Sequence, residues 1–315
     1  MNLADVLHSY IKLQQDTGRR FRADAVVLRA FGRAMGDVDL VEVDPAAVQM
    51  FLAGPGPVTA QCIQKHKILG SFYRFALARG YIEVSPLPAT IPKSPPPMTP
   101  YIYSSEEIVR MLNAAETLRN PASPLQGATF RTVLLLLYGT GLRIGEALAL
   151  AIQDVDLAER VITVRDTKFY KSRLVPVGPR LTAELDAYAR RRRTLPLPAG
   201  EASAFFATRT GAALSYHRAN RLFGRVRTLA GIQREEDARY QPRLHDLRHT
   251  ATVHRVVYWY RTGQDVQRLL PRLATYLGHV GLASTQRYLS MAPELLNAAS
   301  LRFERYARSE MDHEG

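Results

Sequence analysis

A proline-rich segment divides this chain of 315 residues. Residues 91–100 read Ile-Pro-Lys-Ser-Pro-Pro-Pro-Met-Thr-Pro, with five prolines in ten positions. Because proline fixes its own φ angle and lacks an amide hydrogen, such a stretch favours a stiff, extended linker over a helix or a strand. A chain of this length can also form two domains with separate cores. We therefore predict a domain over residues 1–90, a linker over residues 91–100 and a second domain over residues 101–315.

The first domain is predicted to be helical. Apolar residues at helical spacing indicate helices near residues 3–11, 21–35, 46–52 and 59–79. On the last of these helices, Lys67 and Arg74 lie on the outer face, and Lys65 lies near the border of the apolar face.

The second domain combines helices with a small hairpin. Helical patterns cover residues 104–115, 126–138, 181–193, 216–230, 247–260, 272–277, 285–289 and 293–308. Residues 161–164 and 173–177 read as two strands of a hairpin, and residues 204–206 as a candidate third strand. The predicted fold class is mainly α with a small antiparallel β-sheet, in two domains.

The charge of the chain is concentrated in the second domain. The formal net charge is +13, and residues 101–315 contribute 31 basic against 21 acidic side chains, or +10. This excess is expected of a surface that accepts a polyanion, although a simple solubility surplus is the alternative. The single cysteine, Cys62, excludes disulfides and cysteine-based metal sites. Without a signal peptide or a long apolar run, we expect an intracellular protein.

Five short stretches carry basic or hydroxyl side chains, in order along the second domain. They are Thr140–Glu146, Thr167-Lys168, His245–His249, Leu277-Gly278-His279 and Arg287-Tyr288-Leu289. A phosphodiester is negatively charged and repels nucleophiles, so an enzyme without a metal must offset that charge with fixed cations. Arginine suits this task because its planar fork can bond two oxygens at once.

Three of these residues can meet a single phosphate. Arg143 follows Gly139-Thr140-Gly141, which we interpret as a turn that opens a helix and points its amide groups at an anion. Taken alone, this motif is weak and more often describes a surface arginine at a helix cap. His245 and Arg248 are three positions apart and share one helical face.

His279 and Tyr288 are nine positions apart, which places them on opposite sides of an unbroken helix. They converge only if the chain breaks between them, and we expect Gly278, Gly281 and Ser284 to provide that break, with Ser284 or Thr285 as the cap of a new helix. Tyrosine has an unperturbed pKa near 10, so a tyrosine nucleophile needs cations that stabilise its phenolate. Tyr276 is the nearest competitor, but its apolar helix favours a packing role.

Lys168, in the turn of the predicted hairpin, can reach a leaving 5′ oxygen and donate a proton to it. Lys171 is the alternative for this role.

Together these positions resemble a known active site. The set Arg143, Lys168, His245, Arg248, His279 and Tyr288 is similar to that of the tyrosine recombinases, or phage integrase family. The resemblance covers about residues 101–308, and the helical residues 1–90 look like the smaller core-binding domain of that family. The hairpin also resembles the family's, and this favours Lys168 over Lys171.

The resemblance implies a site-specific DNA recombinase that breaks and rejoins strands through a 3′-phosphotyrosyl intermediate and serves a mobile element. Tyr288 would attack the phosphate, and Arg143 and Arg248 would clamp its non-bridging oxygens. His279 would add a hydrogen bond, Lys168 would act as general acid, His245 as general base or orienting group, and Glu146 would brace the site.

The resemblance also implies partners. Double-stranded DNA would be held by the two domains, with Lys65, Lys67 and Arg74 as candidate phosphate contacts, and a homo-tetramer would assemble on two synapsed sites, with or without related recombinases. No metal, cofactor or membrane is implied, and the expected location is the cytoplasm and nucleoid of a bacterial-type cell. The apolar helix at 293–308 would dock on a neighbouring protomer or on its own domain.

The sequence departs from the family's usual pattern in two places. Thr167 stands where a glycine commonly precedes the lysine, and 31 residues separate Arg248 from His279, several more than is common. The longer segment is similar to a transposon-associated branch of the family, and Trp259 within it is expected to be part of the core. Two alternative functions remain: a type IB topoisomerase, and a DNA-binding accessory or regulatory protein.

Overall fold

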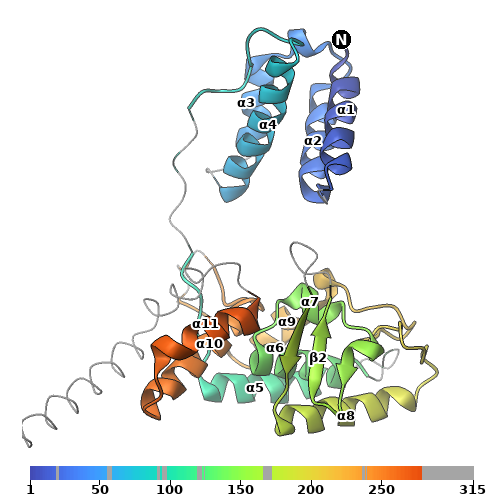
Figure 1. Ribbon diagram of the computed structural model, residues 1–315, viewed down its shortest axis with the longest axis vertical. Coiled ribbons are helices and arrows are strands. Elements are labelled where there is room, and N and C mark those ends of the chain that lie inside the picture. Colours follow the sequence, from blue (N-terminus) through green and yellow to red (C-terminus); the bar gives the residue numbers. More distant parts are fainter. Residues whose placement is uncertain are drawn as a thin grey trace, which may run out of the picture. The chain divides into compact units, whose positions relative to one another are not determined.

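The computed structural model describes residues 1–18, 21–54, 59–90, 93, 98–118, 123, 125–165, 172–235, 238 and 240–278. The chain forms two compact units, Met1–Pro97 and Met98–Gly315, here named the N-terminal unit and the C-terminal unit. The division falls within the proline-rich segment. Figure 1 shows both units.

The N-terminal unit is helical in its described part. Its elements are α1 (Leu3–Asp16), α2 (Arg22–Met35), the short 3-10 helix η1 (Leu40–Glu42), α3 (Pro45–Ala53) and α4 (Ala60–Ala78). An aromatic cluster joins three of these helices: the ring centroid of Tyr10 lies 5.7 Å from that of Phe72, and Phe31 lies 6.2 Å from Tyr73. Such edge-to-face contacts add to the stabilisation that burial provides.

The C-terminal unit contains the remaining described helices and the sheet. Its helices are α5 (Ser105–Glu116), α6 (Gln126–Thr140), α7 (Ile144–Leu148), η2 (Ile152–Asp154), α8 (Pro179–Arg193), α9 (Tyr216–Leu229), α10 (Asp246–Arg261) and α11 (Val266–Leu277). Helix α6 is central, since α5, α8 and α10 all pack against it. Its apolar residues Phe130, Val133 and Leu136 are completely buried, so α6 forms the middle of the core.

A small antiparallel sheet lies in the same unit. Strands β1 (Val155–Asp156), β2 (Val161–Val164) and β3 (Arg173–Pro176) pair in that order, and Val164 is opposite Arg173 in the last residue pair before the connection from β2 to β3. This confirms the predicted fold class. The prediction of a strand at 204–206 is wrong, because Ala204 forms only an isolated bridge with Ala151.

Two other local predictions are corrected by the structure. Gly139 and Thr140 do not form a turn but complete α6, and Gly141 ends that helix in the left-handed conformation, with φ of 64°. Helix α11 begins at Val266, earlier than the predicted residue 272, because it continues through Pro271.

The longer segment between Arg248 and His279 has a structural role in the described residues. It extends α10 and α11, whose facing apolar residues form a separate small core. The members of this core are Val253, Val256, Val257, Val266, Leu270, Leu273 and Leu277. Trp259 is partly buried against it, in agreement with the expected core position.

Candidate active site

Arg143 is positioned by the junction between α6 and α7. It occupies the N-cap position of α7 in an extended conformation, two residues after Gly141, which ends α6. The positive φ of Gly141 favours glycine, and a Cβ atom there would lie 2.7 Å from a methyl group of Leu277, which would have to shift. The close approach of Gly141 to Leu277 brings the start of α7 to the end of α11.

The side chain of Arg143 bridges these two elements. Its Nη1 donates to Oε1 of Glu146 at 2.8 Å, and its Nη2 donates to the carbonyl oxygen of Gly278 at 3.1 Å. The side chain remains 39% exposed, so an external anion can reach the guanidinium.

Arg248 reaches the same place from the first turn of α10. Its Nη1 donates to the carbonyl of Gly141 at 2.6 Å and its Nη2 to the carbonyl of Leu277 at 2.8 Å. Arg143 and Arg248 therefore bind adjacent carbonyls at the end of α11. The structure brings together two of the predicted clamping residues, 105 positions apart in the sequence.

His245 lies directly before α10, and its ring is 5.2 Å from that of His249. Burial lowers the pKa of His245 below its usual 6.5, and the nearby positive charges of Arg248 and Arg243 lower it further. The pKa of His249 is lowered to about 4, mainly by burial and secondly by the neighbouring His245. Both imidazoles are therefore neutral at pH 7, the form in which histidine can accept a proton.

This neutral state of His245 predicts a pH dependence. If His245 is the base in DNA cleavage, the cleavage rate should fall as falling pH protonates His245. Because its pKa in the folded protein is lowered from 6.5, the midpoint of that fall in the single-turnover rate should lie below pH 6.5. In His245→Gln the rate should be low throughout and that acidic fall should be absent; an unchanged acidic fall in the variant would assign the titration to another group.

Glu146 is the electrostatic centre of the described site. Its carboxylate accepts from the Arg143 backbone amide at 3.0 Å and from both terminal nitrogens of Arg173 at 3.1 and 2.8 Å. Burial alone would raise the pKa of Glu146, but the hydrogen bonds from Arg173 and Arg143 outweigh burial and lower it to about 2. Glu146 is thus ionised at neutral pH and holds two arginines at once.

Sequence reasoning assigned no role to Arg173, which is only 13% exposed and lies on β3. The role of Arg173 depends on its pairing with Glu146, which lies 27 positions away, so no local sequence pattern reveals it. A second missed feature is Asp246, whose buried carboxylate accepts from the amide and guanidinium of Arg243 next to His245. The spacing of a helix-capping carboxylate three residues after Arg243 could have indicated it.

The low pKa of Glu146 predicts a loss of stability in Glu146→Gln. A carboxyl group with a pKa of about 2 when folded and near 4.5 when unfolded stabilises the fold above pH 4.5. That stabilisation is lost as the pH falls towards 2. We expect the free energy of unfolding of Glu146→Gln at pH 7 to be lower by about 3 kcal/mol, and the difference from wild type to shrink below pH 4.5.

Urea denaturation at pH 7 and pH 3.5 measures this difference. Glu184→Gln is the matched control, because Glu184 binds Arg131 in the same two-pronged way but is 40% exposed. The free energy of unfolding of Glu184→Gln should be lower than that of wild type by at most about 1 kcal/mol. Equal losses in the two variants would contradict the electrostatic role of Glu146.

Three of the predicted catalytic residues, Lys168, His279 and Tyr288, lie outside the described residues, as do Thr167, Lys171 and the predicted helix at 293–308. The last described residue, Gly278, ends α11 in the left-handed conformation, with φ of 69°. Tyr276 is partly buried, and its hydroxyl donates to the carbonyl of Pro176 at 3.2 Å. Burial raises the pKa of Tyr276, which makes it a weaker nucleophile.

The three basic residues suggested as DNA contacts lie on α4. Lys67 and Arg74 are exposed, and Arg74 donates to the hydroxyl of Ser71 at 3.2 Å. Lys65 is occupied within the unit: its Nζ donates to the carbonyl of Phe51 at 2.7 Å and lies 4.3 Å from the centre of that ring. Lys67 and Arg74 are thus better placed than Lys65 to bind an external phosphate.

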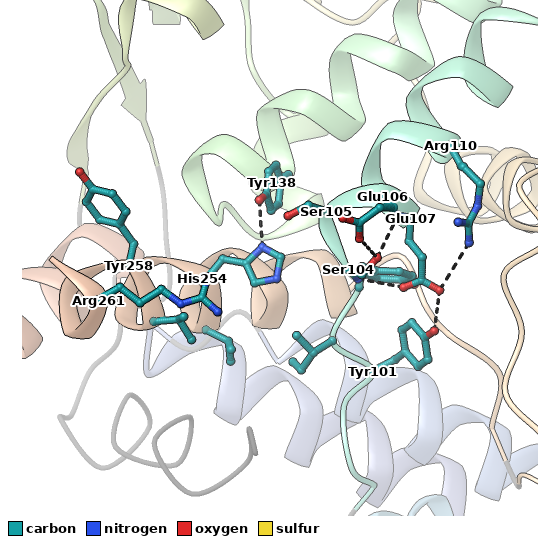
Figure 2. A pocket seen from close by; sticks show the side chains of 14 residues that line it. Tyr101, Ser104, Ser105, Glu106, Glu107, Arg110, Tyr138, His254, Tyr258 and Arg261 are labelled. Carbon is teal, nitrogen blue, oxygen red and sulfur yellow. Dashed lines mark hydrogen bonds and ion pairs between the residues drawn. The ribbon is translucent and has the colours of Figure 1, made fainter. Parts of the chain in front are cut away.

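A separate pocket of about 810 Å³ lies at the start of α5 and along α10. Figure 2 shows its polar side chains, with the Tyr138 hydroxyl 2.9 Å from Nδ1 of His254 and a group around Ser104 and Glu107. None of the predicted site residues lines it. Among the residues that the structure describes, no three histidine, cysteine or carboxylate side chains gather as a metal site requires. In the same residues, no helix is long and apolar enough to cross a bilayer.

Comparison with known proteins identifies the family of the chain. Residues 102–294 match the model of the phage integrase family. An integrase/recombinase of Sinorhizobium fredii is 39% identical over 74% of this chain and 75% of its own length. The tyrosine recombinase XerC of Oceanobacillus iheyensis is 28% identical over 95% of this chain and 94% of its own length.

Solved structures share the fold. A lambda integrase dimer bound to a COC′ core site superposes with a TM-score of 0.67, at 19% identity, over 93% of this chain and 97% of the integrase chain. The Tn1549 transposon integrase in complex with a circular intermediate DNA also gives a TM-score of 0.67, at 16% identity, over 97% of this chain and 99% of its own. From the family match and the sequence identities, the chain belongs to the phage integrase family of tyrosine recombinases.

Proposed function

We propose that this protein breaks and rejoins DNA at specific sites through a 3′-phosphotyrosyl intermediate formed by Tyr288. The observation that carries this proposal is the convergence of Arg143 and Arg248 on adjacent carbonyls at the end of α11, beside the neutral His245. Two guanidinium groups and an imidazole at one point provide what a pentacoordinate phosphate needs: donors for its non-bridging oxygens and a base.

Each residue has a defined part in the proposed reaction. Tyr288 attacks the scissile phosphorus and its phenolic proton passes to His245, while Arg143 and Arg248 bind the non-bridging oxygens with help from His279. The bond from phosphorus to the 5′ oxygen breaks, and Lys168 gives that oxygen a proton. Because the phosphotyrosyl link retains the energy of the broken bond, rejoining requires neither ATP nor a metal.

Double-stranded DNA is the proposed partner. The charge of +10 in residues 101–315 and the exposed Lys67 and Arg74 on α4 support a clamp made by two domains, at 1–90 and 101–315, around the duplex. The lambda integrase and Tn1549 integrase structures that share the fold both contain DNA. This reaction would place the protein with the cell's DNA.

A homo-tetramer on two synapsed sites is part of the proposal, since a lambda integrase tetramer bound to a Holliday junction has the same fold, with a TM-score of 0.66. The recombinase relatives also favour this function over a type IB topoisomerase or an accessory DNA-binding protein. Similarity to a transposon integrase supports service to a mobile element.

The test is recovery of DNA that stays attached to the protein through denaturation. The protein is expressed in cells that carry its native element, denatured, purified under denaturing conditions and digested, and the attached DNA is sequenced. We expect a short set of recurring sequences joined through a 3′ phosphate. Attached DNA of random sequence would favour the topoisomerase, and the absence of attached DNA would favour the accessory protein.

A further inference from the structure

Three arginines bind the last three carbonyls in and after α11, one carbonyl each. Nε of Arg173 donates to Tyr276 at 3.2 Å, Nη2 of Arg248 to Leu277 at 2.8 Å and Nη2 of Arg143 to Gly278 at 3.1 Å. The final carbonyls of a helix have no partners within the helix and form the negative end of its dipole. The three arginines come from β3, α10 and the start of α7, so they fasten the end of α11 to three different elements.

Two of the three arginines are those that the proposed function assigns to the DNA phosphate. A phosphate oxygen accepts stronger hydrogen bonds from guanidinium than a neutral carbonyl does. When DNA binds, Arg143 and Arg248 are therefore expected to turn part of their donors from the carbonyls of Gly278 and Leu277 to the phosphate. Two of the three arginine contacts with the end of α11 would then weaken at the moment when the residues after it must act.

Arg173 differs from the other two arginines. Both of its terminal nitrogens bind Glu146, at 3.1 and 2.8 Å, and Nε binds Tyr276. Its terminal nitrogens are thus already paired with a carboxylate, which binds a guanidinium more strongly than the neutral carbonyls that Arg248 binds. Its contact with the end of α11 is consequently the one that DNA does not compete for.

The fit between Arg173 and the end of α11 is close. A Cβ atom at Gly278 would lie 2.8 Å from Cζ and from Nη1 of Arg173. Gly278 also has a positive φ of 69°, so glycine at this position serves both the helix end and the approach of the guanidinium.

We propose that Arg173 is a positioning residue for DNA cleavage, which holds the end of α11 against Glu146 while Arg143 and Arg248 bind the phosphate. This inference rests on the proposed function. In this proposal Arg173 acts through its contact with the end of α11, and not through the hairpin turn that follows β2 in the sequence.

The test separates DNA binding from cleavage in the full-length protein. We expect Arg173→Gln to bind its DNA site with a Kd within about threefold of wild type and to cleave it about 100-fold more slowly in a single turnover, since misplacement by about 1 Å has effects of that size. Arg173→Lys should be intermediate. Arg131→Gln is the matched control, because Arg131 binds Glu184 through the same fork elsewhere in the unit, and it should stay within about threefold of wild type in both measurements.

Gly278→Ala disturbs the same contact at its other partner. It should slow cleavage strongly in the wild-type background and less in Arg173→Ala, because the guanidinium that the new methyl group would strike is absent. Equal factors in the two backgrounds would overturn the proposal. If Arg173→Gln folds poorly, Arg173→Lys keeps a cation beside Glu146, and a folded Arg173→Lys that cleaves at the wild-type rate would contradict the proposal.

A substrate with sulfur in place of the leaving 5′ oxygen distinguishes the two routes by which Arg173 could act. A sulfur leaving group needs no proton. Arg173→Gln should therefore still cleave this substrate slowly if its defect lies in the position of the end of α11. Recovery to the wild-type rate would instead place the defect at the proton donor and overturn the proposal. Wild-type protein that forms no covalent complex would contradict the proposed function; a covalent complex formed equally fast by wild type and Arg173→Gln would contradict this inference alone.

Discussion

Replacing Tyr288 with phenylalanine is expected to abolish DNA cleavage while DNA binding is retained. The variant keeps the ring but has no oxygen to attack phosphorus, and loss of a nucleophile reduces a rate by at least about 10⁴-fold. The measurement is the yield of covalent protein–DNA complex from a nicked substrate that cannot be rejoined, resolved under denaturing conditions. Binding of the intact site, measured by gel shift, should change by less than about threefold because the phenol adds little to the phosphate contacts.

Tyr276→Phe is the control for Tyr288→Phe. The Tyr276 hydroxyl donates to the carbonyl of Pro176, so its removal is expected to have a small effect on stability and to leave the covalent complex intact. Cleavage that survives in Tyr288→Phe and fails in Tyr276→Phe would reverse the assignment of the nucleophile.

Arg143→Lys is expected to have the second-largest effect, a loss of about 10²- to 10³-fold in the cleavage rate. Lysine keeps the positive charge but not the planar fork that binds a carboxylate and a phosphate together. Because the Arg143 side chain is 39% exposed, we expect the melting temperature to fall only slightly. Single-turnover cleavage at saturating DNA measures the effect.

Arg110→Lys provides the comparison for Arg143→Lys. Arg110 also pairs with a glutamate three positions away, Glu107, and its side chain is 50% exposed, but it lies on α5 and lines the separate pocket. It should cleave DNA at the wild-type rate. A similar loss in both variants would indicate a general dependence on basic charge rather than a clamp.

The sequence was sufficient for the fold class because the apolar periodicity of the helices and the strand pair is local. Residues 161–164 form β2 as predicted, and α4 lies within one residue of its predicted ends. Residues 204–206 were wrongly predicted as a strand because Phe205 and Phe206 are both buried in the core as part of a connection. Helix α11 was predicted too short because proline usually ends a helix, and here the helix continues past Pro271.

The contacts that join the active-site residues form only in the tertiary fold and could not be predicted from the sequence. The residue types and their order in the sequence identified Arg143 and Arg248, but not the carbonyls of Gly278 and Leu277 that bring them together. The partnership of Glu146 with Arg173 joins α7 to β3 and depends on the tertiary fold, so no pattern within either segment contains it. The catalytic roles of all six residues stay predictions, and Lys168, His279 and Tyr288 also lie outside the described part of the chain.

The most direct measurement identifies the residue that carries the DNA. The covalent complex is isolated, digested with nuclease and protease, and the modified peptide is sequenced by mass spectrometry. We predict a peptide containing Arg287-Tyr288-Leu289, with a nucleotide joined through its 3′ phosphate to Tyr288. A nucleotide attached to Tyr276 or to any residue other than Tyr288, or a linkage through a 5′ phosphate, would contradict the account.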